Sequence, residues 1–287
     1  FWRPTIKQTG KERKHKVIDM CQSMGYSRAG YYKANRVIEM KESKSEKICN
    51  LVLDWKRLMK HIGGKKLYEQ LKDEIAKMEG PKIGRDKFFD ILRERHLLVK
   101  RKRNYAKTTD SYHRFHTYEN LVKDLILTGP DQAVASDITY LRTEKCFLYL
   151  SLQTDLYSRM ITGWDLSYSL SVEGSMRALG MTIKQSRNPN GMIHHSDRGI
   201  QYCCKAYIKK LKKHKMRISM TEENHCYENA VAERVNGILK QEFELDCTFK
   251  NYKEAYKAVK QAIFIYNYYR KHWSLGLCTP VQIHKAV

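Results

Sequence analysis

The sequence predicts two regions of different fold class, an all-α N-terminal region and an α/β C-terminal region. Up to about residue 99, apolar side chains recur at helical spacing, and Gly-Gly and Gly-Pro pairs separate the stripes. From residue 130 the sequence changes to short β-rich runs, three of them in succession. Helical and β-rich stretches then alternate, so we expect a mixed five-stranded sheet packed with helices.

The charge of the chain points to a polyanionic partner. Its 287 residues include 54 Lys and Arg against 31 Asp and Glu, a formal net charge of +23. Each phosphate that a basic side chain neutralises releases condensed counterions, so this excess favours nucleic acid. A merely basic soluble protein is the alternative on charge alone. Residues 1–110 hold 29 basic and 14 acidic side chains, so we expect the N-terminal region to grip the partner.

Residues 1–43 are predicted to form a small helix-turn-helix segment. A helical spacing of apolar residues over 14–24 ends at Gly25, and a Ser can cap the helix that follows. A plain helical hairpin is the alternative reading of this pattern. As a DNA-binding segment it would offer Ser27, Arg28, Tyr31 and Tyr32.

Residues 44–99 predict a second, three-helix unit. Its helices follow an apolar stripe from Ile48 to Ile62, a second from Leu67 to Met78, and a third over 85–96. Basic side chains on the last helix suit a helix laid in a DNA major groove. The candidate DNA contacts on it are Arg85 and Lys87.

Residues 100–129 lack periodicity and are predicted to be a basic linker. The cluster at its start is either a solvated charge run or a contact to a phosphate backbone. Its members are Lys100, Arg101, Lys102 and Arg103. His113 and His116 have the spacing of metal ligands, but the chain has no Cys-x-x-Cys pair, so we expect no zinc site.

The α/β region is predicted to span residues 130–246. Strands are expected at 134–141, 147–153, 160–166, 192–195 and 217–220, and helices at 172–185, 204–214 and 228–244. Within residues 247–287 we expect an amphipathic helix over 252–269 and an irregular tail.

Three carboxylic acids of this strongly basic chain are candidate catalytic residues. Asp137, Asp197 and Glu233 lie in the stretches VASDITYL, HHSDRG and ENAVAERVNG, and 35 residues separate the second acid from the third. If these three side chains met at one polar site, their carboxylates would repel each other, and one of them would stay protonated. A pair of divalent cations removes that conflict and forms the clamp that phosphodiester cleavage and joining require.

The stretches around these acids resemble the DDE transposases of the insertion-sequence-three family, which are relatives of retroviral integrases. A lone Asp-Asp-Glu triplet would be weak support, but six stretches occur in the family's order. They are SDITYL at 136–141, TDLYSR at 154–159, HHSDRGIQY at 194–202, CYENAVAER at 226–234, LKQE at 239–242 and SLGLCTP at 274–280. The chain begins with Phe1. We expect either a trimmed chain or the downstream part of a longer protein, because this family often fuses an upstream helix-turn-helix and leucine-zipper frame.

The resemblance implies an RNase H-like catalytic core, with the first acid midway along the first strand, the second after the fourth strand and the third on the next long helix. It implies binding to terminal inverted repeats, followed by metal-dependent cleavage and strand transfer. The implied cofactor is two Mg²⁺ or Mn²⁺ ions, with Asp137 bridging both and Asp197 and Glu233 each holding one. Double-stranded DNA, as transposon ends and as target, is the implied partner. Pairing two ends implies at least a dimer.

Further candidate DNA contacts surround the second and third acids. On a helix, Asn229, Asn236 and Lys240 share the face of Glu233. By the resemblance, Lys240 matches the family's basic residue seven positions after the glutamate and could hold a terminal phosphate; a plain surface lysine is the alternative. His195 and Arg198 flank Asp197, where a structural histidine is an equally good reading.

Composition also limits the setting and the rival functions. The sequence shows no membrane-length apolar run, signal peptide or disulfide framework, which predicts a reducing, cytoplasmic setting. The resemblance implies that this is a bacterial cytoplasm, with the protein on the nucleoid when it is bound to DNA. Two alternatives to a transposase stay open. One is a domesticated DNA-binding protein without turnover, and the other is a structure-selective nuclease of RNase H-like fold.

Overall fold

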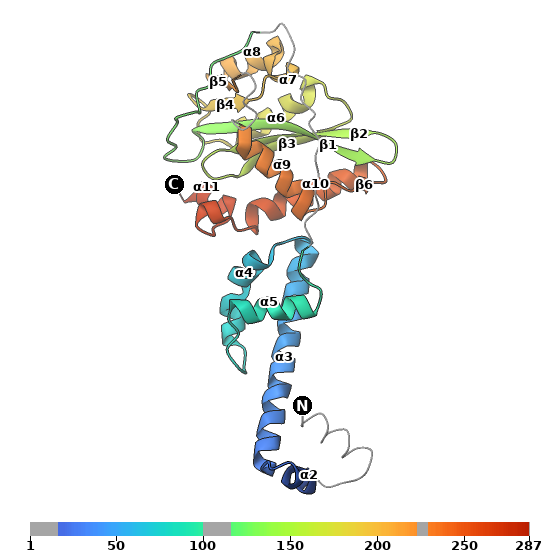
Figure 1. Cartoon of the computed structure of the whole chain (residues 1–287). Helices are drawn as coiled ribbons and strands as arrows, with labels where there is room; N and C mark the ends of the chain where they lie inside the picture. The colour runs from blue at the N-terminus through green and yellow to red at the C-terminus, as the bar shows by residue number, and fades with distance from the viewer. Residues whose placement is uncertain (1–16, 100–115, 223–228, 287) are drawn as a thin grey trace. The chain divides into compact units, whose positions relative to one another are not determined.

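The computed structural model describes residues 17–99, 116–222 and 229–286. The chain divides into two compact units. The first comprises residues 1–58 and 62–100, and the second comprises residues 59–61 and 101–287. Figure 1 shows the helices of the first unit and the sheet of the second.

The first unit is entirely helical where it is described. Its helices are α2 (Val17–Ser23), α3 (Arg28–Leu58), α4 (Gly64–Lys77) and α5 (Arg85–Glu94). Gly25 after α2 has a positive φ of 72°, and the Ser27 side chain accepts the backbone N–H of Gly30 at 3.0 Å, so the predicted stop and cap are both present. The apolar stripes form a buried core of Ile48, Val52, Leu67, Leu71, Ile75, Phe88, Ile91 and Leu92.

One helix runs through the boundary predicted between residues 43 and 44. α3 is 31 residues long and joins the first predicted segment to the second without a break. The physical reason lies in its sequence, since no Gly or Pro interrupts residues 31–58 and the KESKSEK stretch consists of residues that a helix tolerates. The two segments are therefore parts of one compact unit.

The second unit is built on a mixed sheet. Its main strands lie in the order β3 (Ile161–Ser167), β2 (Phe147–Asp155), β1 (Ala133–Thr143), β4 (Ile193–Ser196) and β5 (Arg217–Met220). The β1–β2 and β2–β3 pairs are antiparallel, and the β1–β4 and β4–β5 pairs are parallel. The predicted five strands are present, but a short sixth, β6 (Thr248–Phe249), pairs with β1 as well. Two residues are too few to give a periodic signal in the sequence.

Helices cover both faces of this sheet (Figure 1). α6 (Val172–Gln185), α7 (Ile200–Cys203) and α8 (Lys205–Lys213) pack on one face. α9 (Ala230–Glu242) and α10 (Tyr252–Tyr268) pack on the other, where the core includes Leu141, Leu150, Val235, Leu239 and Tyr266. The topology is that of an RNase H-like α/β core.

The predicted irregular tail contains ordered structure. After a 3₁₀ turn at Trp273–Leu275 comes α11 (Pro280–Lys285), which begins with a capping box between Thr279 and Gln282. The signal was in the sequence, where Thr-Pro precedes Gln at the third helical position. The cap fixes where the chain re-enters a helix after α10.

β1 has an interrupted edge, and this feature positions the candidate site. On one side, β4 pairs with β1 residues 133–136 and β6 pairs with residues 142 and 143. Among the described residues, no strand pairs with residues 137–141 on that side, and α9 lies against β1 there. Side chains on this stretch can therefore face a space that the sheet leaves open.

Two further findings bear on the setting of the protein. In the described part of the chain, no helix is both long and apolar enough to cross a membrane. The seven cysteines that the structure describes all carry free thiols, in agreement with the absence of a predicted disulfide framework.

The contact between β3 and α6 predicts a large loss of stability when Gly163 is replaced. A Cβ at Gly163 would overlap the backbone oxygen of Ala178 and lie 2.6 Å from Thr182 Oγ1. Gly163→Ala should lower the free energy of unfolding by about 3 kcal/mol, measured by urea denaturation. Gly237→Ala, in α9 with nothing within 4 Å of the added Cβ, is the matched control. It should raise stability by up to about 1 kcal/mol, and equal effects of the two changes would contradict the close packing.

Candidate active site

Asp137 lies on β1 where the strand edge is open. Its carboxylate is half-buried and accepts two hydrogen bonds. The backbone N–H of Ile138 donates to Oδ1 at 2.9 Å, and Nδ2 of Asn236 on α9 donates to Oδ2 at 2.6 Å. Asp137 thus lies within the first strand, as predicted, and Asn236 of α9 holds its side chain.

Asp197 is brought beside Asp137 by the register of the sheet. Ser136 of β1 is the parallel partner of Ser196 of β4, so the acids that follow the two serines lie side by side where the β1–β4 pairing ends. Asp197 comes directly after β4, and its Oδ1 accepts the backbone N–H of Gly199 at 3.0 Å. This bond steadies the turn that leads into α7.

Glu233 stands in the first turn of α9 with an exposed side chain. A carboxylate near a helix N-terminus is stabilised by the helix dipole. The same helix carries Asn236, which contacts Asp137, so Glu233 lies over the open edge of β1 on the turn before that contact.

The electrostatics show that the three acids are neighbours. The pKa of Asp137 is raised to about 7, first because burial disfavours its charge and then because of the negative charge of Asp197. Hydrogen bonds from Ile138 and Asn236 oppose this rise, and the charge of Glu233 adds to it.

The donor set fits hard divalent cations, which prefer carboxylate oxygens. A cation between the acids would relieve the repulsion that raises the pKa of Asp137. As they stand, however, no three His, Cys, Asp or Glu side chains among the described residues converge closely enough to hold a metal ion. Three like charges without a cation repel each other, which opposes such convergence.

Two asparagines predicted to contact DNA are instead buried against β1. Asn229 Nδ2 donates to the carbonyl of Ser136 at 3.2 Å, and Asn236 Nδ2 donates to Asp137. Their exposed fractions are 5% and 7%. They hold the first acid and its strand in place, because the face of α9 that carries them packs on the sheet. The prediction that they contact DNA directly is wrong for this structure.

Lys240 lies on the side of α9 that faces the site, two turns after Glu233. It is half-buried, and its ammonium lies 4.5 Å from the ring centroid of Tyr140 on β1. Burial lowers the pKa of Lys240, while the charge of Asp137 opposes that shift. Lys240 therefore contacts the Tyr140 ring and interacts with the charge of Asp137, so the alternative of a plain surface lysine does not describe it. Tyr140 was not singled out from the sequence, where it reads as one aromatic residue in a strand.

His195 is a structural histidine. Its side chain is 1% exposed and its Nδ1 shares a hydrogen bond with Ser219 Oγ at 2.8 Å. Its neighbour His194 lies on the other face of β4, in a buried network with Ser136 and Tyr207, and burial lowers the pKa of His194 to about 3. For His195 the structure therefore supports the alternative, a structural histidine, and not the predicted DNA contact.

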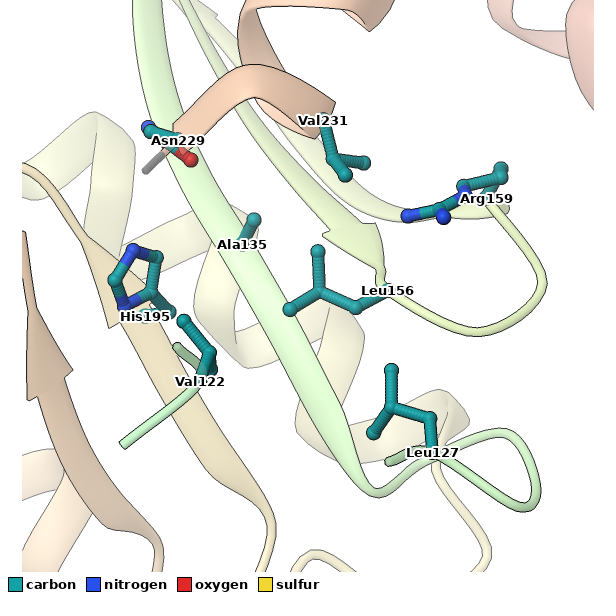
Figure 2. Close-up of a pocket in the computed structure, with 8 residues that line it drawn as sticks. All are labelled: Val122, Leu127, Ala135, Leu156, Arg159, His195, Asn229 and Val231. Carbon is teal, nitrogen blue, oxygen red and sulfur yellow. The ribbon is translucent and has the colours of Figure 1, made fainter. Parts of the chain in front are cut away.

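A cavity of about 170 Å³ lies next to the acids on the α9 side of the sheet. Figure 2 shows His195 and Val122 on one side of Ala135, and Leu156 and Arg159 on the other. Ala135 lies two residues before Asp137 on the same face of β1, so the cavity adjoins the acids along the strand. It also receives Asn229 and Val231 from the start of α9.

The other predicted DNA contacts fall into four groups. Tyr31 is 5% exposed and packs with Met20 and Cys21, so it is a core residue and that prediction is wrong. Arg198 is half-buried and donates Nε to the carbonyl of Thr221, which gives it a structural bond near the site. The remaining described candidates, Ser27, Arg28, Tyr32, Arg85 and Lys87, are exposed. Lys100, Arg101, Lys102 and Arg103 lie outside the described residues.

Asp155, in the TDLYSR stretch, belongs to a turn and not to the site. It is fully buried, and its Oδ1 accepts the backbone N–H and the hydroxyl of Ser158. Its Oδ2 accepts the backbone N–H of Asp131. These bonds lower the pKa of Asp155 against its burial, with His284 of α11 contributing.

The chain is similar to known proteins both in sequence and in structure. Sequence models of the integrase core domain match residues 128–226 and 214–280. The 31 kDa protein of insertion element IS600 from Shigella sonnei is 34% identical over 265 residues, covering 91% of this chain and 96% of that protein. Transposase InsF for insertion sequence IS3A from Escherichia coli K12 is 29% identical over 273 residues, covering 92% of each. The HTLV-2 integrase catalytic core domain, solved in complex with magnesium, is 18% identical with a TM-score of 0.45, covering 55% of this chain and 98% of that one.

Proposed function

Because this chain belongs to the insertion-sequence-three family of DDE transposases, we propose that it binds the terminal inverted repeats of an insertion sequence and catalyses metal-dependent DNA cleavage and strand transfer. The observation that carries the proposal is the cluster of three acids at the open edge of β1, where Asp197 and Glu233 both act on the charge of Asp137.

The proposed roles follow from the family resemblance and from the chemistry of divalent metal ions. Asp137 lies centrally and would bridge two Mg²⁺ or Mn²⁺ ions, with Asp197 and Glu233 each holding one from its own side. Bound there, the ion pair would supply charge to both the attacking and the leaving oxygen of an in-line displacement. Asn236 orients the Asp137 carboxylate, and Lys240 holds a DNA phosphate beside the scissile bond.

The proposed partners are double-stranded DNA, as transposon ends and as target, and further copies of the chain. A single active site works on one end at a time, so pairing two ends requires a dimer or a larger assembly on DNA. We place this activity in the bacterial cytoplasm, on the nucleoid when DNA is bound, since the two insertion-element relatives compared above come from bacteria.

A supercoiled-plasmid assay with the element that encodes the chain tests the proposal. Excised circles or insertions are the expected products in Mg²⁺. Binding without turnover would identify a domesticated DNA-binding protein. Nicking of branched DNA alone would identify a structure-selective nuclease. Either of these two results would overturn the proposed function.

Asn236→Ala is predicted to slow strand transfer while leaving the fold intact. Loss of the 2.6 Å bond frees one oxygen of Asp137 to rotate. Outer-shell partners of metal ligands are typically worth about 10- to 100-fold in activity or metal affinity, and we expect a loss in this range. The apparent Mg²⁺ affinity should fall with the rate, measured by strand transfer across a Mg²⁺ titration. Gln241→Ala, an exposed position on the same helix, is the matched control, and an equal effect there would contradict the orienting role.

DNA binding is predicted to depend steeply on salt and to reside mainly in residues 1–107. A fragment of these residues should bind terminal-repeat DNA, because it carries most of the charge surplus and its residues 1–58 and 62–100 form one compact unit. Electrophoretic mobility shifts at several salt concentrations give the measurement. Specific binding by residues 118–287 alone, with none by the N-terminal fragment, would show the assignment to be wrong.

A further inference from the structure

Two adjacent aromatic rings on the β1–β2 hairpin lie between two cations beside the active site. Lys240 Nζ lies 4.5 Å from the ring centroid of Tyr140. The Tyr140 ring meets the Phe147 ring edge-on, with centroids 5.5 Å apart. The guanidinium carbon of Arg142 lies 5.7 Å from the Phe147 centroid. We name Lys240, Tyr140, Phe147 and Arg142 the cation–aromatic row.

The outer half of the row faces solvent. Phe147 is 46% exposed and Arg142 is exposed, while Tyr140 and Lys240 are half-buried. Register pairs Arg142 with Phe147 across the two strands, so both side chains stand on the same face of the hairpin. The charges of Glu144 and Lys145 in the hairpin turn cancel, and the row therefore keeps the positive charge of its two cations.

The row is continuous with the active site. Tyr140 follows Asp137 by three residues, so their side chains point to opposite faces of β1, but both residues lie on the stretch that has no strand partner on its open edge among the described residues. Lys240 is common to both, since its ammonium contacts Tyr140 and feels the charge of Asp137. Figure 1 shows the β1–β2 hairpin beside β6, at the far end of this open stretch from β4.

We propose that the cation–aromatic row binds unpaired nucleotides of the transposon-end DNA strand next to the scissile phosphate. Lys240 and Arg142 hold successive phosphates, and Phe147 and Tyr140 stack against the bases. The inference rests on the proposed function, because that function places a scissile phosphate at Asp137.

The chemistry of the row favours an unpaired strand over duplex DNA. A duplex keeps its bases stacked on one another and presents phosphates to the protein surface, which calls for cations alone. Aromatic rings with a cation on either side instead match a strand whose bases are splayed out, since each base has a face to stack and each nucleotide has a phosphate. At the active site, opening of the terminal base pairs would supply such nucleotides.

Equilibrium binding of the full chain in EDTA tests the row without any chemistry. The probes are fluorescein-labelled duplexes of the element's terminal repeat, either blunt or with unpaired thymidines at the cleaved end. We expect the wild type to bind the tailed duplex more tightly than the blunt one. Phe147→Ala should weaken binding of the tailed duplex about tenfold, the size expected for one lost base stack, and leave binding of the blunt duplex unchanged. Phe147→Trp should restore it.

Matched variants make the outcome decisive. Phe264→Ala, which removes a ring that is 50% exposed on α10, should affect neither probe. Equal affinities of wild type and Phe147→Ala for the tailed terminal-repeat duplex would overturn the proposal, and so would a loss confined to tailed duplexes of random sequence, which would assign the row to target DNA. Wild-type strand transfer is scored in parallel. Its absence removes the proposed function, whereas intact strand transfer with equal affinities removes only the row.

Discussion

Asp137→Ala is expected to abolish cleavage and joining by this chain, and Asp197→Ala and Glu233→Ala are expected to do the same. Each acid would supply oxygen to the metal pair, and Asp137 is the central member on which the charges of the other two act. The loss should exceed the roughly 10- to 100-fold that removal of outer-shell partners costs. Strand-transfer yield on terminal-repeat DNA in Mg²⁺ gives the measurement.

Three controls separate lost chemistry from lost fold. Binding of terminal-repeat DNA should stay nearly intact in all three variants. Asp137→Asn should keep the fold without metal, because it removes one of three like charges that repel each other. Glu173→Ala, which removes an exposed acid from α6, should leave strand transfer unchanged. Normal strand transfer by any one of the three alanine variants would remove the proposed active site.

The second large effect is expected for Lys240→Glu, which should lower strand transfer by about 100-fold, the size typical of losing a preorganised electrostatic contact. Lys240 stands two helical turns after Glu233 and within the field of Asp137, so its ammonium can meet a phosphate near the scissile bond. The substitution replaces attraction with repulsion at that phosphate. Lys240→Arg keeps the charge and the contact with the Tyr140 ring, and should be much milder.

The informative measurement for Lys240 is strand-transfer yield on pre-nicked end DNA at several salt concentrations. Lys257→Glu makes the same charge reversal at an exposed position on α10 and should cost little. The fold should be unchanged in all these variants. If wild type and Lys240→Glu gave equal yields at low salt, Lys240 would be only a surface charge, and the proposed contact with a phosphate would be wrong.

Much of the fold could be predicted because its signals are local. Asp137 falls within the first β-rich run, Asp197 follows the fourth, and Glu233 lies on the long helix that comes after the fifth. The structure places each acid at the expected position. Periodicity of two or 3.6 residues is visible in any window long enough to hold a strand or a helix.

The remainder depends on contacts between distant parts of the chain. β6 is only two residues long and is defined by pairing with β1, which no local pattern reveals. The same holds for the contact between Lys240 and Tyr140, which are 100 residues apart in the sequence.

The direction of individual side chains is the second feature that the sequence could not predict. Tyr31 and Asn236 share helices with exposed residues. The helix-turn-helix pattern suggested a DNA contact for Tyr31, and a shared helix face with Glu233 suggested one for Asn236. Packing turns Tyr31 into the core of Met20 and Cys21, and turns Asn236 onto Asp137. The pattern of a helix predicts which face is apolar, but a polar residue at the edge of that face can turn either way.

The central claim, that Asp137, Asp197 and Glu233 form one metal site, is tested most directly by anomalous scattering from Mn²⁺ in crystals of the chain bound to its terminal-repeat DNA. We predict two peaks enclosed by the three carboxylates, with the shared ion contacts made through Asp137. Mn²⁺ bound elsewhere in crystals that remain competent for strand transfer would contradict the account.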